Sequence, residues 1–347
     1  MRVINPYADS KLTSANHKKS ELHVHIITDE NDEGHGWDES MGTEEEMAQE
    51  IEALGYDIYA RTAKDQILAL QSNNIHLLEP SQESTHGTEH TTIFFSDTIG
   101  GSYAGYNNQG ALMFRAHPND LSRPKYTYEE ILSQFNRYGN LLGIEVCQRN
   151  SSEQIIDGEL RRGFVQYLRS SEMWDKLLRD TPARRNIYGI STNDAYNLDG
   201  LETVSEHYNN GWTDIIIEGD ITNNKIYDAL KKGCFFFVSY MDKLASVPLV
   251  TDIEVNGLDI SITIDGSYDE VYWISGNEVV GTGTSHTADP SKGYVRFEIW
   301  TSPSDYWPDK HVPEDPLDSS YYDTNIVGSQ PFLFYNINRL VYMMRYL

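Results

Sequence analysis

The chain has 347 residues, a length that suits one large domain or two of ordinary size. Its 53 Asp and Glu residues outnumber its 27 Lys and Arg residues, so the formal net charge is −26. A polyanion repels phosphate backbones and anionic lipid surfaces, so we expect neither nucleic acid nor a membrane as a partner. The acidic residues are spread along the chain, which indicates a solvated surface of the halophilic type.

Only two cysteines occur, Cys147 and Cys234, and both lie in apolar runs where a small buried side chain fits. This excludes a disulfide framework. The opening segment MRVINPYADSKL contains no apolar stretch that could act as a signal sequence, and no run approaches the ~20 apolar residues of a membrane span. We therefore expect a protein that is cytoplasmic or part of a soluble or viral assembly.

The first predicted strand spans residues 21–27, where apolar side chains alternate with Glu21, His23 and His25. An acidic loop follows, and Thr43 with three glutamates after it marks the start of a helix. Further strands are predicted at 56–61, 91–96, 111–118, 141–147, 187–192 and 214–219, and helices at 44–54, 128–138, 153–179 and 223–233. This alternation predicts an α/β fold with a parallel sheet or barrel.

The pattern changes at about Val247. Short alternating strands follow, separated by Asn-Gly, Asp-Gly and Gly-Asn turns. We therefore expect two domains: a β/α barrel preceded by an N-terminal strap at 1–246, and a small β-sandwich-like domain at 247–347.

Two histidines on the first strand are the strongest chemical signal. His23 and His25 are two residues apart, so both imidazoles project from the same face of a strand and can bind one metal ion. Taken alone, the pair fits equally well with two histidines that are hydrogen-bonded or face solvent.

Further segments, in order along the chain, resemble the PHP family (polymerase and histidinol phosphatase) of metal-dependent phosphoesterases. That family opens with a His-x-His strand end. Here GTEHTT resembles its Gly-x-Glu segment, ALMFRAHP its His-Pro strand end, GIEVCQRN its Glu-Val-Tyr-Asn segment and GISTNDAY its closing Asp-x-His segment. The resemblance covers about residues 5–335 and implies a distorted (β/α)7 barrel followed by a small all-β domain. The metal ligands that it implies are His23, His25, Glu89, His117 and Asp194.

Part of the family's ligand set is missing. Ala63 and Lys64 stand where the family has Asp-His, Tyr196 stands in place of the last His, and Asp29 is a contracted match to the usual Ser-Asp. Family enzymes hold three metals, and the missing ligands resemble those of the third. The remaining imidazoles and carboxylates suit zinc, manganese or iron. We therefore expect one divalent ion or none, and at most two.

Two cations are candidate catalytic residues. Lys64 could supply positive charge in place of the third ion, or it points to solvent. Arg115 lies two residues before His117 on the same strand face and could bind a phosphate through two nitrogens, or it forms a salt bridge. His86 and His90 flank Glu89 and could complete a metal site, although such loop histidines more often support ligands or face solvent.

Two functions follow from this sequence. The first is a phosphoesterase that hydrolyses a small phosphorylated substrate, with activity that is weak or lost. The second is a binding or structural protein on a degenerate PHP scaffold. Such a protein would use its C-terminal β domain to contact protein partners in a larger assembly, for example a virion.

Overall fold

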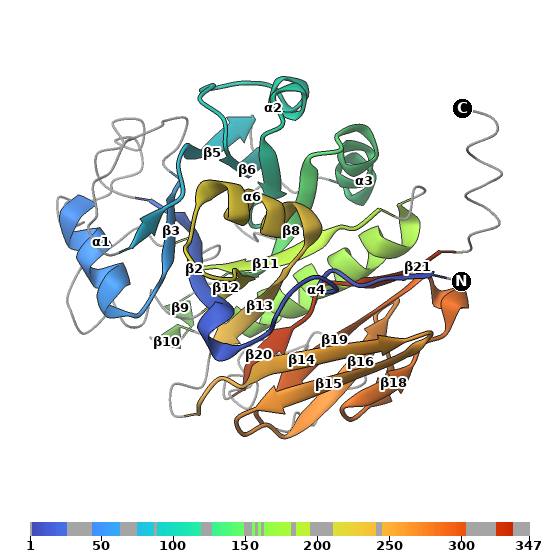
Figure 1. Ribbon diagram of the computed structural model, residues 1–347. Coiled ribbons are helices and arrows are strands. Elements are labelled where there is room, and N and C mark those ends of the chain that lie inside the picture. The colour runs from blue at the N-terminus through green and yellow to red at the C-terminus, as the bar shows by residue number, and fades with distance from the viewer. Residues whose placement is uncertain are drawn as a thin grey trace.

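The computed structural model describes residues 2–25, 44–62, 75–86, 89–118, 127–148, 155–156, 159–160, 163–181, 185–194, 211–240, 245–302 and 324–335. Among these residues, 44% lie in strands and 23% in helices. Five helices accompany large, curled, mixed sheets in the described part of the chain (Figure 1). The prediction of a helix-rich (β/α)7 barrel is therefore wrong.

The directions of the strands explain this correction. Neighbouring strands of a β/α barrel are parallel and need crossovers of a dozen or more residues. Here β5 (Ser81–His86) and β6 (Glu89–Phe94) form an antiparallel hairpin, and β6 is also antiparallel to β7 (Leu112–Arg115). Only two residues separate β5 from β6, which is too short for a crossover. Alternating strands and helices along a sequence do not fix these directions.

The first sheet has the order β1-β21-β19-β20-β13-β12-β2-β3-β4, and β16 and β17 extend it from β19. Its strands are β1 (Arg2–Ile4), β2 (His17–Val24), β3 (Ile58–Arg61), β4 (His76–Leu77), β12 (Gly211–Ile216), β13 (Phe235–Tyr240), β16 (Glu270–Ser275), β17 (Glu278–Thr282), β19 (Tyr294–Trp300), β20 (Asn325–Gly328) and β21 (Phe332–Tyr335).

The second sheet has the order β11-β8-β7-β6-β5. It adds β8 (Leu141–Gln148) and β11 (Tyr188–Thr192) to the three strands given above. Smaller sheets pair β14 (Leu249–Asn256) with β15 (Asp259–Asp265) and β15 with β18 (Ser285–Thr287), and β9 (Ile155–Ile156) with β10 (Glu159–Leu160).

Backbone hydrogen bonds join both edges of the second sheet to the first sheet. The amide of Glu83 donates to the carbonyl of Thr62 at 3.2 Å, and the amide of Asp194 donates to the carbonyl of His23 at 2.9 Å. The ends of β2, β3, β5 and β11 therefore meet, and their side chains are brought to one place.

The predicted helices are present at four positions: α1 (Glu44–Ala53), α3 (Tyr128–Arg137), α4 (Gly163–Asp180) and α6 (Asn223–Lys232). The helix expected at 153–179 begins only at Gly163, and the short strands β9 and β10 lie in the part before it. A fifth, α2 (Tyr103–Gln109), was not predicted. Local sequence explains α3, since Thr127 and Glu130 form a capping box and Ile131 and Phe135 bury one face. No helix in the described residues is both long and apolar enough to cross a membrane.

The hydrogen-bonded sheet continues across the expected domain boundary at 246/247. β13 pairs with β20, and β20 pairs with β19, so strands from both sides of the boundary belong to one sheet. One apolar core includes Tyr7 and Phe236 from one side and Phe297 and Phe332 from the other. Both expected domains share this core, and the boundary itself stays a prediction.

Arg296 connects the two sides through a buried ion network. It lies in β19 and is fully buried against α4, which packs between the second sheet and the C-terminal strands (Figure 1). Its guanidinium donates to both carboxylate oxygens of Asp175, at 2.9 and 2.8 Å, and also to Glu298. The guanidinium carbon lies 4.7 Å from the centre of the Trp174 ring. The cation is thus enclosed by two carboxylates and an aromatic face.

His17 forms a second polar link, between β2, β12 and β14. Its Nδ1 lies 2.5 Å from Asp214 Oδ2, and its Nε2 lies 3.0 Å from the carbonyl oxygen of Val250. Both hydrogen bonds form only when the imidazole is protonated, because neither a carboxylate nor a carbonyl donates. Burial lowers the pKa of His17, but the hydrogen bond and the charge of Asp214, together with the hydrogen bond to Val250, outweigh burial and raise it.

Replacing His17 with Gln should therefore destabilise the protein most at acidic pH. A group whose pKa is raised by folding contributes stability that is complete below its unfolded pKa of ~6.5 and is lost as pH rises through the folded pKa. Urea unfolding of both proteins should show a difference of about 1.5–3 kcal/mol at the acidic end, the usual range for a hydrogen bond to a charged group. A difference that stays constant between about pH 5.5 and pH 9 would contradict a stabilising imidazolium.

Candidate metal centre

The candidate centre is built from the ends of β2, β7 and β11 and from the neighbouring strands β5 and β6. His23 lies near the end of β2 and His25 directly follows that strand, and both side chains are fully buried. Leu22 and Val24 alternate with them and are also fully buried, which fixes the register of the strand. The predicted ligands His117 and Asp194 lie directly after β7 and β11. The structure therefore brings together four of the predicted ligand residues.

The first cluster consists of His23, His25 and Asp194. The two Nε2 atoms are 3.1 Å apart, and each lies 3.2 Å from Asp194 Oδ1. Ligand atoms at the ~2.0–2.1 Å bond lengths of a tetrahedral zinc ion are about 3.3 Å apart. These three atoms therefore have the spacing of three ligands to one ion.

The second cluster consists of Glu83, His90 and His117. Glu83 Oε1 lies 3.2 Å from His117 Nε2, which is a ligand spacing, and 2.6 Å from His90 Nδ1, which is a hydrogen bond. All three side chains are buried. A carboxylate with two imidazoles is a common donor set for zinc, manganese or iron.

Glu83 also faces the first cluster. Its Oε1 lies 3.4 Å from His23 Nε2, and its Oε2 lies 3.4 Å from His25 Nε2. Oε2 is buried and accepts no hydrogen bond in the part of the chain that the structure describes. A buried carboxylate oxygen normally accepts a hydrogen bond. A bound metal ion would satisfy this oxygen in place of a hydrogen-bond donor. Glu83 thus lies between the two clusters.

Sequence reasoning missed Glu83 and gave Glu89 as the glutamate among the metal ligands. The backbone of Glu89 pairs with His86 at the end of the hairpin, and its side chain lies outside the described residues, so its role stays a prediction. A signal for Glu83 existed in the hairpin. In the β5–β6 register Thr85 is opposite His90, so Glu83, two residues before Thr85, shares a face with His90.

The charges of the cluster determine its pKa values. Burial lowers the pKa of His23, but the charges of Asp194, Glu145 and Glu83 outweigh burial and hold it well above its ordinary value. Burial raises the pKa of Glu83, but the charges of His90 and His23 outweigh it and hold that pKa well below its usual range. Burial also raises the pKa of Asp194, but the charges of His23, His25 and His117 and the hydrogen bond to His25 together outweigh it and lower that pKa to about 2. Both carboxylates are therefore held in the ionised form that binds metals.

Two cluster residues have unusual backbone conformations. His117 has a φ of 26° and Asp194 a φ of 46°, in the left-handed region that non-glycine residues rarely adopt. Only four non-glycine residues with positive φ occur in the described ranges, so half of them lie in this centre. Strain of this kind is concentrated at functional sites, where surrounding contacts hold it in place.

The remaining predicted residues are placed differently. Arg115 is buried, and its Nη1 donates to Tyr103 Oη at 2.8 Å and to Gln134 Oε1 at 3.1 Å, on α2 and α3. These hydrogen bonds to two neutral groups suit a structural role, and both the salt bridge and the catalytic role stay predictions. Lys64 and Tyr196 lie outside the described residues.

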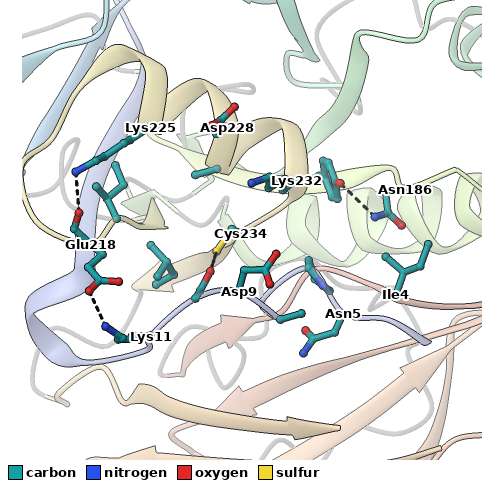
Figure 2. Close-up of a pocket in the computed structure, with 17 residues that line it drawn as sticks. Ile4, Asn5, Asp9, Lys11, Asn186, Glu218, Lys225, Asp228, Lys232 and Cys234 are labelled. Atoms are coloured by element: carbon teal, nitrogen blue, oxygen red, sulfur yellow. Dashed lines mark hydrogen bonds and ion pairs between the residues drawn. The ribbon is translucent and has the colours of Figure 1, made fainter. Parts of the chain in front are cut away.

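A pocket of about 550 Å³ lies away from this centre, between the N-terminal segment and α6 (Figure 2). Tyr188 lines it at the start of β11, whereas Asp194 follows the other end of that strand. The lining ion pair of Lys11 with Glu218 is exposed. The pocket and the metal centre are thus at opposite ends of the sheet.

No family model matches this chain, and no curated protein matches it either. The structure establishes two buried clusters that could hold a metal ion.

Proposed function

We propose that this protein is a metal-dependent phosphoesterase. It resembles the PHP family in its metal-ligand residues but does not have a helix-rich β/α barrel. The observation that carries the proposal is the position of Glu83 between two imidazole clusters. One carboxylate shared by two ions is typical of sites that hydrolyse phosphate esters. The substrate would be a small phosphorylated molecule, since the net charge of −26 disfavours a nucleic acid.

The donor atoms fit zinc, manganese or iron, with places for up to two ions. The first ion would be held by His23, His25 and Asp194, the second by His90 and His117, and Glu83 would be shared. Metal ions in such sites lower the pKa of bound water and stabilise charge on phosphoryl oxygens.

Near-complete burial of the centre favours a second candidate function. His117 and His90, the most accessible of the six side chains, are each only 6% exposed. Closed sites of this kind are typical of structural metals, whereas catalytic sites keep an open position. The alternative is therefore a non-catalytic protein in which the metal stabilises a scaffold that binds protein partners.

Metal analysis and an activity assay separate these functions. The protein would be stripped with a chelator, reloaded separately with zinc, manganese or iron, dialysed, and analysed for metal content and for hydrolysis of p-nitrophenyl phosphate. We expect one or two ions per chain, and hydrolysis that requires them. Bound metal without hydrolysis of this or other phosphomonoesters would favour the structural alternative. A chain that binds no metal would contradict both.

A further inference from the structure

Glu145 is a buried carboxylate that contacts both clusters. It lies in β8, is 1% exposed, and was not among the predicted ligands. Its Oε1 lies 2.7 Å from His23 Nδ1, and its Oε2 accepts the backbone amide of His117 at 2.7 Å. One carboxylate is therefore hydrogen-bonded to a residue of the first cluster and to a residue of the second.

The contact with His23 fixes which ring nitrogen faces the cluster. A carboxylate only accepts hydrogen bonds, so the hydrogen between Glu145 and His23 lies on Nδ1. The nitrogen left for a metal is Nε2, the atom that faces His25 and Asp194. Carboxylates that hold a ligating imidazole in this way also increase its basicity.

The contact with His117 acts on the backbone. His117 has a φ of 26°, a conformation that is costly for a residue with a side chain. Its amide is held by Glu145 while its imidazole Nε2 reaches Glu83 Oε1. The second cluster therefore depends on a backbone conformation that Glu145 stabilises.

We infer that Glu145 is a positioning residue that couples the two clusters, orienting the His23 imidazole for the first and the His117 backbone for the second. This inference rests on the metal binding in the proposed function. Glutamine at position 145 has one acceptor and one donor group where the carboxylate has two acceptors. In one orientation its carbonyl oxygen accepts from His23 Nδ1, and its NH₂ group then faces the backbone amide of His117, which is also a donor. Alternatively, it can accept from His117 and donate to His23 Nδ1, which shifts the ring hydrogen to Nε2.

The test compares zinc affinities of the full-length wild type, Glu145→Gln and His90→Gln, measured by competition with a chelator. Glu145→Gln should weaken at least one of the two zinc ions by about 10–100-fold, the range for residues that hold metal ligands, because either orientation of the amide loses the acceptor for one cluster. His90→Gln should weaken only the second ion. Unchanged affinity in Glu145→Gln, with zinc bound normally by the wild type, would overturn the coupling and leave the proposed function standing. A wild type that binds no zinc would overturn the proposed function and the coupling together.

A measurement on the wild type keeps the inference falsifiable if Glu145→Gln does not fold. Long-range ¹H–¹⁵N NMR of the zinc-loaded protein distinguishes the two ring nitrogens of His23. We expect a hydrogen on Nδ1 and zinc on Nε2. Zinc on Nδ1 would overturn the inference without the use of any variant.

Discussion

Replacing Arg296 with methionine should lower the free energy of unfolding by about 3–5 kcal/mol, the range for removing one partner of a buried ion pair. The side chains of Arg296, Asp175 and Glu298 are fully buried. Methionine fills much of the same volume but leaves two carboxylates buried without their cation, and it removes the contact over the Trp174 ring. Urea unfolding monitored by tryptophan fluorescence would measure the change.

The control for this experiment is an exposed ion pair in the same region. Lys292 lies 2.9 Å from Glu278, and the two side chains are 42% and 67% exposed. Replacing Lys292 with methionine should cost at most about 1 kcal/mol, as is usual for surface pairs. Similar losses for the two variants would show that burial of Arg296 does not set the size of the effect. Arg296→Lys should be intermediate, because lysine keeps the charge but lacks the planar fork that binds both oxygens of Asp175.

Replacing Glu83 with glutamine should remove metal binding from both clusters. The amide carries no charge and offers one acceptor oxygen, so it cannot serve two ions as the carboxylate does. We expect each affinity to fall by at least about 100-fold, which exceeds the loss expected for a residue that only supports a ligand. Metal content after chelation, reloading and dialysis would be measured by elemental analysis.

Two comparison variants make the Glu83 experiment specific. Asp194→Asn should weaken the first ion only, because Asp194 belongs to one cluster. Glu79→Gln makes the same chemical change four residues earlier, outside both clusters, and should leave metal content unchanged. If Glu83→Gln retained one tightly bound ion, Glu83 would belong to a single site and the bridging arrangement would be wrong.

The sequence predicted much of the centre and of the local structure. His23, His117 and Asp194 were identified because a His-x-His strand and two strand-end residues have a recognisable order. Most helices were predicted from capping signals and spacing, which are local properties. Strand direction was not predictable in this way, because it depends on contacts between distant segments. The same limit hid Glu83 and the partners of Arg296, which are defined by hairpin register and by packing across the molecule.

The pairing of β1 with β21 bears on how the chain folds as it is synthesised. Arg2 is opposite Tyr335, and the amide of Gln330 donates to Tyr7 Oη across 323 positions. Nascent chains fold from the N-terminus as they leave the ribosome, so β1 emerges long before its partner strand β21 is synthesised. Contacts between such distant segments slow folding, because a long loop must close before they form. The pairing of β1 is therefore expected to form only after β21 has left the ribosome, and β1 is an unpaired strand that other chains can contact until then.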